Sequence, residues 1–355
     1  MNPNSTLTCG YREELPAGPR TGTRQPLVLE PGTVARRHRF DHRWRDARRS
    51  GGGQEVLNRE WDRLVDQLTR GDCTPFLGAG ACVGTLPTGK ELSERWADEY
   101  KYPFENRTDL ADVMQFASVV EKDAVTVKQG VTRYLSDLGK PDFTHAAEPH
   151  ALLARCPLSV YLTTNYDDFL TQALCREGKD PSTVVCPWYR GANDDAGTRI
   201  PREYQPQGDR PLVYHLHGSL RHPSSLVLTE RDYSEFLVML VTETGLDERR
   251  IVPTQVLSAL TQRPLLFIGY SLRDPSFRTL FHGLVRSVAE VQRRRHISVQ
   301  LPLPEDLTAD ARQRAERYVE QYFDDLNISV YWGSAHAFCT ELDERLRERD
   351  GKPGG

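Results

Sequence analysis

The segment TPFLGAGAC at residues 74–82 decides the fold class, because a short apolar run leads straight into a turn of small residues. Other short runs are also rich in β-branched and aromatic residues, and all but the one at 296–301 stop at Gly, Asn or Ser; they occupy residues 159–165, 211–218, 264–271, 296–301 and 328–333. Helical patterns such as ADARQRAERYVEQYFDDL lie between several of them. Strands that are apolar on both faces and separated by helices predict an α/β protein with a parallel sheet covered on both sides.

Two stretches interrupt this alternation of strands and helices. Residues 86–150 contain helical patterns such as GKELSERWADEY but no good strand, and residues 219–262 are similar. We expect both stretches to be helical insertions, the first packed over one edge of the sheet.

The first 53 residues differ in composition from the rest of the chain. They contain ten arginines and no lysine, and they end in RRSGGG. The glycine run at residues 51–53 predicts a boundary, with the folded domain at 54–355. We interpret the Arg-rich extension either as a disordered or loosely packed arm or as a docking segment for a partner or a nucleic-acid backbone.

Length and composition are those of a globular protein. The 355 residues suffice for one large domain or two modest ones, with 38% hydrophobic and 27% charged residues. The net charge of -4 does not point to nucleic acid. No apolar run reaches the roughly 18 residues of a membrane span, and the first residues lack a signal-peptide core. We therefore expect a cytoplasmic protein with no membrane partner.

Cysteine and histidine spacing gives no metal site. The seven cysteines form no C-x-x-C pair, which excludes a four-cysteine zinc site with ribbon spacing. His215 and His217 face one side of a strand and could bind a metal, but no third ligand is obvious. We expect no metal and interpret His217, nearer the strand end, as a general base.

Two glycine turns are candidates for phosphate contacts. In FLGAGAC, the small residues Gly78, Ala79 and Gly80 let backbone N–H groups approach a phosphate, although such turns also occur wherever a strand and a helix pack closely. In LLFIGYSLRDP, Gly269 and Ser271 suit contacts to a ribose or a phosphate. From these residues alone, both interpretations of the first turn stay open.

The stretch YLTTNYDDF at residues 161–169 ends a strand in an amide, a phenol and two carboxylates. Asn165 either caps the following helix or faces the crevice at the carboxyl end of the sheet, where ligands bind in such folds. Asp167 or Asp168 could equally supply the cap, which would leave Asn165 for other work.

Together these motifs resemble those of the SIR2 superfamily, in order and broad spacing, over about residues 57–346. GAGAC is similar to the sirtuin phosphate loop G-A-G-x-S, TTNYD to T-Q-N-x-D, LHGS to the H-G motif and GYSLRDP to G-T-S-L. The strings LPTGKEL, LTERDYSEF and GYSLRDPSFR resemble more closely the bacterial SIR2-like branch of anti-phage effectors, which lacks the sirtuin zinc module. The resemblance implies a Rossmann-like NAD-binding domain with a helical lid and no zinc.

The resemblance also implies residue roles. Asn165 would lie near the nicotinamide ribose, Asp167 would contact the nicotinamide amide, and His217 would be the base on the ribose side. The pyrophosphate would be lined by Gly78, Ala79 and Gly80, and the adenosine half by Gly269 and Ser271. Cys82 stands where the family usually has serine, and capping of the next helix falls to Asp168.

Three functions fit these motifs. The resemblance favours an NAD+ hydrolase that releases nicotinamide and ADP-ribose and defends the cell against phage by NAD depletion. The alternatives are an NAD-dependent protein deacylase and a non-catalytic sensor of NAD or an ADP-ribose derivative. Because uncontrolled NAD depletion is toxic, we expect a homo-oligomer and a regulatory protein partner, such as an ATPase, a nuclease or a sensor encoded nearby.

Overall fold

The computed structural model describes residues 51–189, 192, 196–201, 203–242, 251–270, 295–300 and 308–350. The chain divides into two units, Met1–Asp41 and His42–Gly355, and all of these residues lie in the second. The Arg-rich extension before Gly51 and the candidate residue Ser271 lie outside the described residues. The first described helix, α1 (Gly51–Thr69), includes the glycine run in its first turn.

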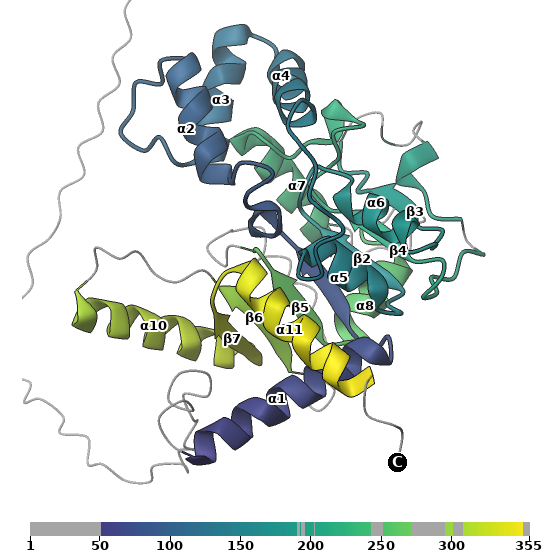
Figure 1. Ribbon diagram of the computed structural model, residues 1–355. Coiled ribbons are helices and arrows are strands. Elements are labelled where there is room, and N and C mark those ends of the chain that lie inside the picture. The colour runs from purple at the N-terminus through teal and green to yellow at the C-terminus, as the bar shows by residue number, and fades with distance from the viewer. Residues whose placement is uncertain are drawn as a thin grey trace, which may run out of the picture. The chain divides into compact units, whose positions relative to one another are not determined.

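The described strands form one parallel seven-stranded sheet in the order β3-β4-β2-β1-β5-β6-β7 (Figure 1). The strands are β1 (Thr74–Leu77), β2 (Val160–Thr163), β3 (Ser182–Val185), β4 (Leu212–His215), β5 (Leu265–Ile268), β6 (His296–Gln300) and β7 (Ile328–Trp332). Each of the six apolar runs forms a strand, and the predicted parallel sheet is confirmed.

The sequence interpretation missed the edge strand β3. It is four residues long, Ser182–Val185, and its first two residues are only half buried. Lys179, Asp180 and Pro181 precede it, and Pro187 follows it after one buried cysteine. A strand this short has too few apolar positions to show a pattern, and its pairing with β4 supplies what the sequence lacks.

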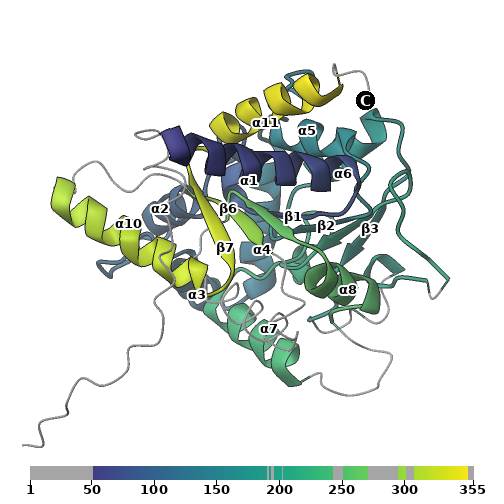
Figure 2. The same ribbon diagram turned by 90° about the horizontal axis from the view of Figure 1, so that it is seen from below.

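Helices cover both faces of the sheet, as predicted, and Figure 2 shows the two layers. Adjacent residues of β1 show the division: Leu77 packs in one core cluster with Trp61 and Phe338, whereas Phe76 packs in another with Phe236 and Phe267. The first layer consists of α1, α5 (Pro149–Arg155), α6 (Phe169–Arg176) and α11 (Ala335–Asp350). The second consists of α7 (Glu230–Thr242), α8 (Thr254–Gln262) and α10 (Ala309–Asp324).

The helices α2 (Gly89–Glu99), α3 (Leu110–Glu121) and α4 (Ala124–Ser136) form a third core cluster of their own. The cluster begins at a capping box, in which Thr88 and Glu91 each bond the other's backbone N–H. It packs on Leu226 and on Tyr166, which follows the carboxyl end of β2. These helices therefore lie beside the edge of the sheet where the candidate site residues are.

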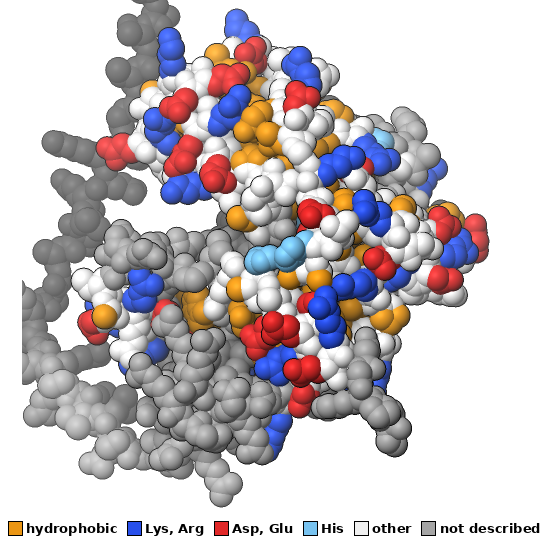
Figure 3. Space-filling model, in the orientation of Figure 1, with side chains coloured by type: hydrophobic (Ala, Val, Ile, Leu, Met, Phe, Trp, Pro, Cys, Tyr) orange, Lys and Arg blue, Asp and Glu red, His pale blue; other side chains and the backbone are white. Residues whose placement is uncertain are grey.

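The face in Figure 3 shows Lys, Arg, Asp and Glu side chains interspersed over α2, α3 and α4. Charges of both signs at this spacing largely cancel over a Debye length of about 8 Å at physiological salt. The described residues of α2, α3 and α4 therefore present no extended basic field on this face. None of the described helices combines the length and hydropathy that a bilayer-spanning segment requires.

Stability is expected to fall on acidification because of buried His296. The backbone N–H of Leu265 donates to its Nδ1 at 2.9 Å, and burial lowers its pKa from 6.5 to about 4. Below pH 6.5 His296 binds a proton in the unfolded chain but stays neutral in the folded chain. The free energy of unfolding therefore decreases as the pH falls to about 4. The total loss is of order 3 kcal/mol, measured as the shift of urea unfolding curves between pH 7 and pH 4.5.

His296→Asn is the matched control for this pH dependence. The amide oxygen of asparagine occupies nearly the position of Nδ1 and still accepts from Leu265, but it does not titrate in this range. The variant should therefore lose less stability on acidification than the wild-type chain. Parallel pH profiles for the two proteins would contradict the assignment.

Candidate functional site

The glycine turn after β1 is tied to the end of β5. Gly78 N donates to Ile268 O at 3.0 Å, and Gly80 N donates to Gly269 O at 2.8 Å. The turn continues as a single 3-10 helix, Ala79–Cys82, in which Ala79 is exposed and Cys82 is buried. The three predicted residues of this turn and Gly269 are thus brought together at the carboxyl edge of the central strands.

Glycine is required where the two turns touch. Gly269 has φ +70, and a Cβ there would lie 2.1 Å from Ala81 N; a Cβ on Gly80 would lie 2.6 Å from Gly269 Cα. Neither distance is compatible with a side chain. The close packing that the sequence left open as an explanation of G-A-G is therefore present, and it leaves backbone atoms of the turn at the ligand-binding edge of the sheet.

Asn165 does not cap the helix that follows it. Its side-chain Nδ2 donates to Gly78 O at 3.1 Å and to Cys82 Sγ at 3.2 Å, and the side chain is buried. These contacts bind the end of β2 to the glycine turn of β1. The amide is thereby fixed with its donors toward the turn, and Oδ1 takes part in none of the described hydrogen bonds.

Of the two carboxylates after Asn165, Asp167 and not Asp168 caps the following helix. Asp167 Oδ1 accepts from Phe169 N at 3.0 Å and so caps α6, whereas Asp168, the expected cap, makes no capping bond with its side chain. Asp168 instead accepts from Gln172 and pairs with Arg221 at 2.8 Å. Burial would raise the pKa of Asp168, but Arg221 and Gln172 hold it below its usual value. The prediction for Asp168 was wrong because its side chain turns toward Arg221.

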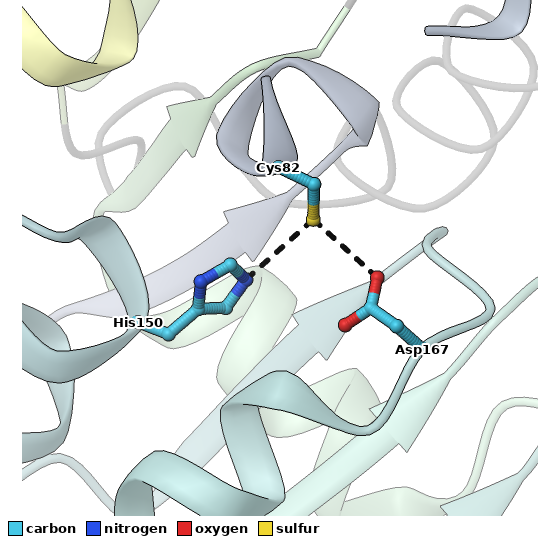
Figure 4. Close-up of side chains that lie close together, drawn as sticks. All are labelled: Cys82, His150 and Asp167. Carbon is cyan, nitrogen blue, oxygen red and sulfur yellow. Dashed lines mark hydrogen bonds between the residues drawn. The ribbon is translucent and has the colours of Figure 1, made fainter. Parts of the chain in front are cut away.

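A cluster of buried polar side chains surrounds the Cys82 thiol (Figure 4). Cys82 Sγ lies 3.4 Å from Asp167 Oδ2 and 3.9 Å from His150 Nε2. On its other side, His150 Nδ1 lies 2.6 Å from Glu148 Oε1, and Glu148 Oε2 accepts from Ala151 N at 2.7 Å. The sulfur, imidazole and carboxylates come from three segments: the turn after β1, the start of α5 and the loop after β2.

Electrostatics keep this thiol neutral. Burial raises the pKa of Cys82 well above its usual value, and the neighbouring Asp167 carboxylate raises it further. Burial would also raise the pKa of Glu148, but its hydrogen bond with His150 lowers it below the usual range. Because only a thiolate is a strong nucleophile, Cys82 is not poised for covalent catalysis at neutral pH.

The two histidines of VYHLHG lie in different surroundings. The buried His217 ring packs edge-on against the rings of Tyr233 and Phe236 of α7, with centroids 5.5 and 5.2 Å away. His215 Nδ1 lies 3.1 Å from the backbone oxygen of Asn165, and burial lowers the His215 pKa. A neutral His215 therefore donates to the Asn165 carbonyl and fixes the backbone there.

Sequence reasoning missed Glu148 and His150. Glu148 is the N-cap of α5 and Pro149 its first residue, a helix-start pattern that was readable in EPHALLAR. A helix that connects parallel strands runs back along the sheet, so its first turn lies at the carboxyl edge. That rule would have placed His150 near Asn165.

The fold and this edge define a Rossmann-like α/β protein, with polar side chains and a glycine turn at the carboxyl ends of the central strands. Residues 159–331 match the family model described as SIR2-like domain. The resemblance to SIR2-like proteins that the motifs predict is confirmed over these residues.

Curated relatives support the same family. The chain is 30% identical over 283 residues to "NAD(+) hydrolase ThsA" of Bacillus cereus (strain MSX-D12), covering 76% of this chain and 53% of that protein. It is 26% identical over 245 residues to "NAD(+) hydrolase ThsA" of Acinetobacter baumannii (strain 532279), covering 67% and 44%. The chain thus spans about half the length of these relatives or less.

A solved structure described as "Structural Basis for the Mechanism and Regulation of Sir2 Enzymes" aligns with 82% of this chain and 99% of its own. The TM-score is 0.40 and the sequence identity 15%. Because this similarity is low, the assignment of a Rossmann-like fold rests on the strand order of the parallel sheet.

Proposed function

We propose that this chain hydrolyses NAD+ at the nicotinamide–ribose bond, giving nicotinamide and ADP-ribose, and that it serves as a cytoplasmic anti-phage effector by depleting NAD+. The observation that carries the proposal is the junction of Asn165 with Gly78 and Cys82 at the edge where dinucleotides bind in such sheets. Relatives named NAD(+) hydrolases support the choice of substrate.

Cleavage of the nicotinamide–ribose bond needs no strong general acid. Nicotinamide leaves as a neutral group from a cationic ring, so the protein has to orient the ribose, a water and a proton acceptor. With the Asn165 donors bound to Gly78 O and Cys82 Sγ, its Oδ1 is the atom that would accept from a ribose hydroxyl or the attacking water. An amide does this without placing a charge beside the oxocarbenium-like centre.

In this proposal Asp167 and His217 complete the site. Asp167 would accept from the nicotinamide amide, and its own position is fixed by the bond from Phe169 N. His217 would take the proton, with its ring orientation held by Tyr233 and Phe236. Gly78, Ala79 and Gly80 would line the pyrophosphate, with Gly269 beside them; because the N–H groups of Gly78 and Gly80 already donate to Ile268 O and Gly269 O, the N–H of Ala79 would be the donor of this turn.

The neighbouring aspartates give a matched test. Asp167→Asn keeps the cap on Phe169 N and the side-chain shape, but it removes the charge beside Cys82. We expect kcat/KM for NAD+ to fall by about 10- to 100-fold, as is usual for losing a hydrogen bond to a charged group. Asp168→Asn removes only a partly exposed pair with Arg221 and should change kcat/KM less than about twofold. Nicotinamide release by the purified full chain measures both.

Other outcomes of this assay identify other functions. Nicotinamide release only in the presence of an acyl-lysine peptide would replace hydrolysis by deacylation. Saturable NAD+ binding without turnover, under all activating conditions, would replace it by a sensor. Equal rates in the two aspartate variants would remove Asp167 from the site.

We further propose that the chain acts as a homo-oligomer held inactive until a regulatory protein partner engages it. A cell that carries an NAD-depleting enzyme survives only while the enzyme is restrained. Comparing the mass of the purified chain in solution with and without NAD+ tests self-association. A purely monomeric and fully active chain would exclude this form of control.

A further inference from the structure

Cys82 and two side chains beside it form a set of donors for a metal ion. Cys82, His150 and Asp167 are all buried, and one ligand atom from each lies within 4.8 Å of the others. The pairs Sγ–Nε2 and Sγ–Oδ2 are separated by 3.9 and 3.4 Å. Figure 4 shows the imidazole and the carboxylate directed at the sulfur from two sides.

These separations match the span of a zinc ion. Zinc binds sulfur at about 2.3 Å, imidazole nitrogen at about 2.0–2.1 Å and carboxylate oxygen at about 2.0–2.2 Å, usually in a tetrahedron. Ligand atoms at these lengths and near-tetrahedral angles lie about 3.3–3.6 Å apart. The Sγ–Oδ2 pair at 3.4 Å lies within that spacing, and the Sγ–Nε2 pair at 3.9 Å lies slightly above it.

The three ligand atoms converge on one point of the cluster. His150 Nε2 and Asp167 Oδ2 both face Cys82 Sγ, at 3.9 and 3.4 Å. A thiolate sulfur, an imidazole nitrogen and a carboxylate oxygen each carry a lone pair, so a cation placed between them would bind all three atoms.

The surroundings are those that orient metal ligands. Glu148 Oε1 holds His150 Nδ1 at 2.6 Å, which is the carboxylate–histidine arrangement found behind zinc-bound imidazoles. Asp167 is oriented by Phe169 N through its other oxygen, which leaves Oδ2 toward the sulfur. Asn165 Nδ2 donates to Sγ and would offset charge on a bound thiolate.

We propose that Cys82, His150 and Asp167 bind one Zn²⁺, with Glu148 orienting His150. A mixed sulfur, nitrogen and oxygen set favours zinc over calcium or magnesium. Three protein ligands leave a fourth position open to water or to a ligand. This departs from the expectation of no metal, because the ligands come from three segments that no sequence spacing unites and not from paired cysteines.

The metal site has a consequence that rests on the proposed function. Cys82 belongs to the glycine turn, and Asp167 is the residue proposed to bind the nicotinamide amide. Zinc and NAD+ would then require the same side chains. Bound zinc therefore inhibits hydrolysis, and removing it with a chelator restores the activity.

Cobalt substitution tests the site independently of any activity. The full chain, stripped with a chelator and kept reduced, is titrated with Co²⁺. One equivalent should produce a thiolate-to-cobalt charge-transfer band and the visible bands of a tetrahedral ion, and Zn²⁺ should displace it. Cys82→Ser should abolish the charge-transfer band, while Cys175→Ser, which removes an exposed thiol, should leave it unchanged.

Glu148→Gln distinguishes an oriented site from chance proximity. Loss of the carboxylate behind His150 should weaken cobalt binding by about 10- to 100-fold without removing the charge-transfer band. Melting curves recorded with chelator show whether each variant is folded. No band in the wild-type chain, or a band that survives Cys82→Ser and disappears in Cys175→Ser, would overturn the site.

Zinc inhibition is measured against each protein's own zinc-free rate. We expect the wild-type chain to be inhibited and Cys82→Ser to resist concentrations that inhibit the wild type. If the chain hydrolyses no NAD+ at all, the proposed function fails while the cobalt titration still decides the metal site. A cobalt band with no zinc inhibition of an active enzyme would overturn the shared-ligand consequence.

Discussion

Asn165→Ala is expected to slow nicotinamide release from NAD+ by about 100-fold or more, the usual effect of removing one preorganised polar group from a reacting centre. Under the proposed function, this amide orients the ribose or the water, and alanine leaves nothing in its place. The loss should appear in kcat as well as in kcat/KM, because the contact matters most when the glycosidic bond is breaking. Single-turnover measurements with excess enzyme separate the chemical step from product release.

The control for Asn165→Ala must account for stability. The substitution removes two buried hydrogen bonds, to Gly78 O and Cys82 Sγ, and should cost about 1–3 kcal/mol of unfolding free energy. Asn106→Ala, on the exposed loop between α2 and α3, removes an amide of the same type away from the sheet edge. Full activity in a folded Asn165→Ala protein would exclude the amide from catalysis.

Gly269→Ala is expected to lower the unfolding free energy by at least about 3 kcal/mol, which is at the severe end for one substitution. Its positive φ already disfavours a side chain, and the new Cβ would lie 2.1 Å from Ala81 N. The clash is with backbone, so relief requires the turns after β1 and β5 to separate. Urea unfolding measures the loss, and NAD+ binding should weaken with it because the glycine turn is displaced.

Gly130→Ala is the opposite case and serves as the control. Gly130 lies within α4, and a Cβ there meets no atom within 4 Å. Alanine should therefore stabilise the protein by about 0.5–1 kcal/mol, the difference in helix propensity. If both variants had the same stability, the interlocked turns would not be the reason for glycine at position 269.

The sheet could be predicted from sequence because the information is local. Most of the six recognised strands are largely apolar runs that end in Gly, Asn or Ser, and a sheet covered on both faces favours this pattern. The edge strand β3 escaped because half of its short length is polar. Its existence depends on the partner β4 rather than on its own residues.

The site was harder to predict because it is assembled from segments far apart in the chain. Motif order located the glycine turn and the amide at one edge of the sheet, but the Cys82–His150 contact spans 68 residues that carry no shared motif. Asp167 caps α6 in place of Asp168, whose side chain pairs with Arg221, a residue 53 positions further along the chain. Such choices are decided by neighbours that meet only in the folded chain.

The buried ion pair between the helical cluster and α7 has a mechanical consequence. Lys128 Nζ of α4 lies 2.8 Å from Asp232 Oδ1 of α7, and the next residue of α7, Tyr233, touches the ring of His217. Moving α4 away from α7 would leave a buried charge without its partner, which costs about 3–5 kcal/mol. We therefore expect α4 and α7 to move together. We expect a displacement of the outer helices to move Tyr233 against the ring of His217.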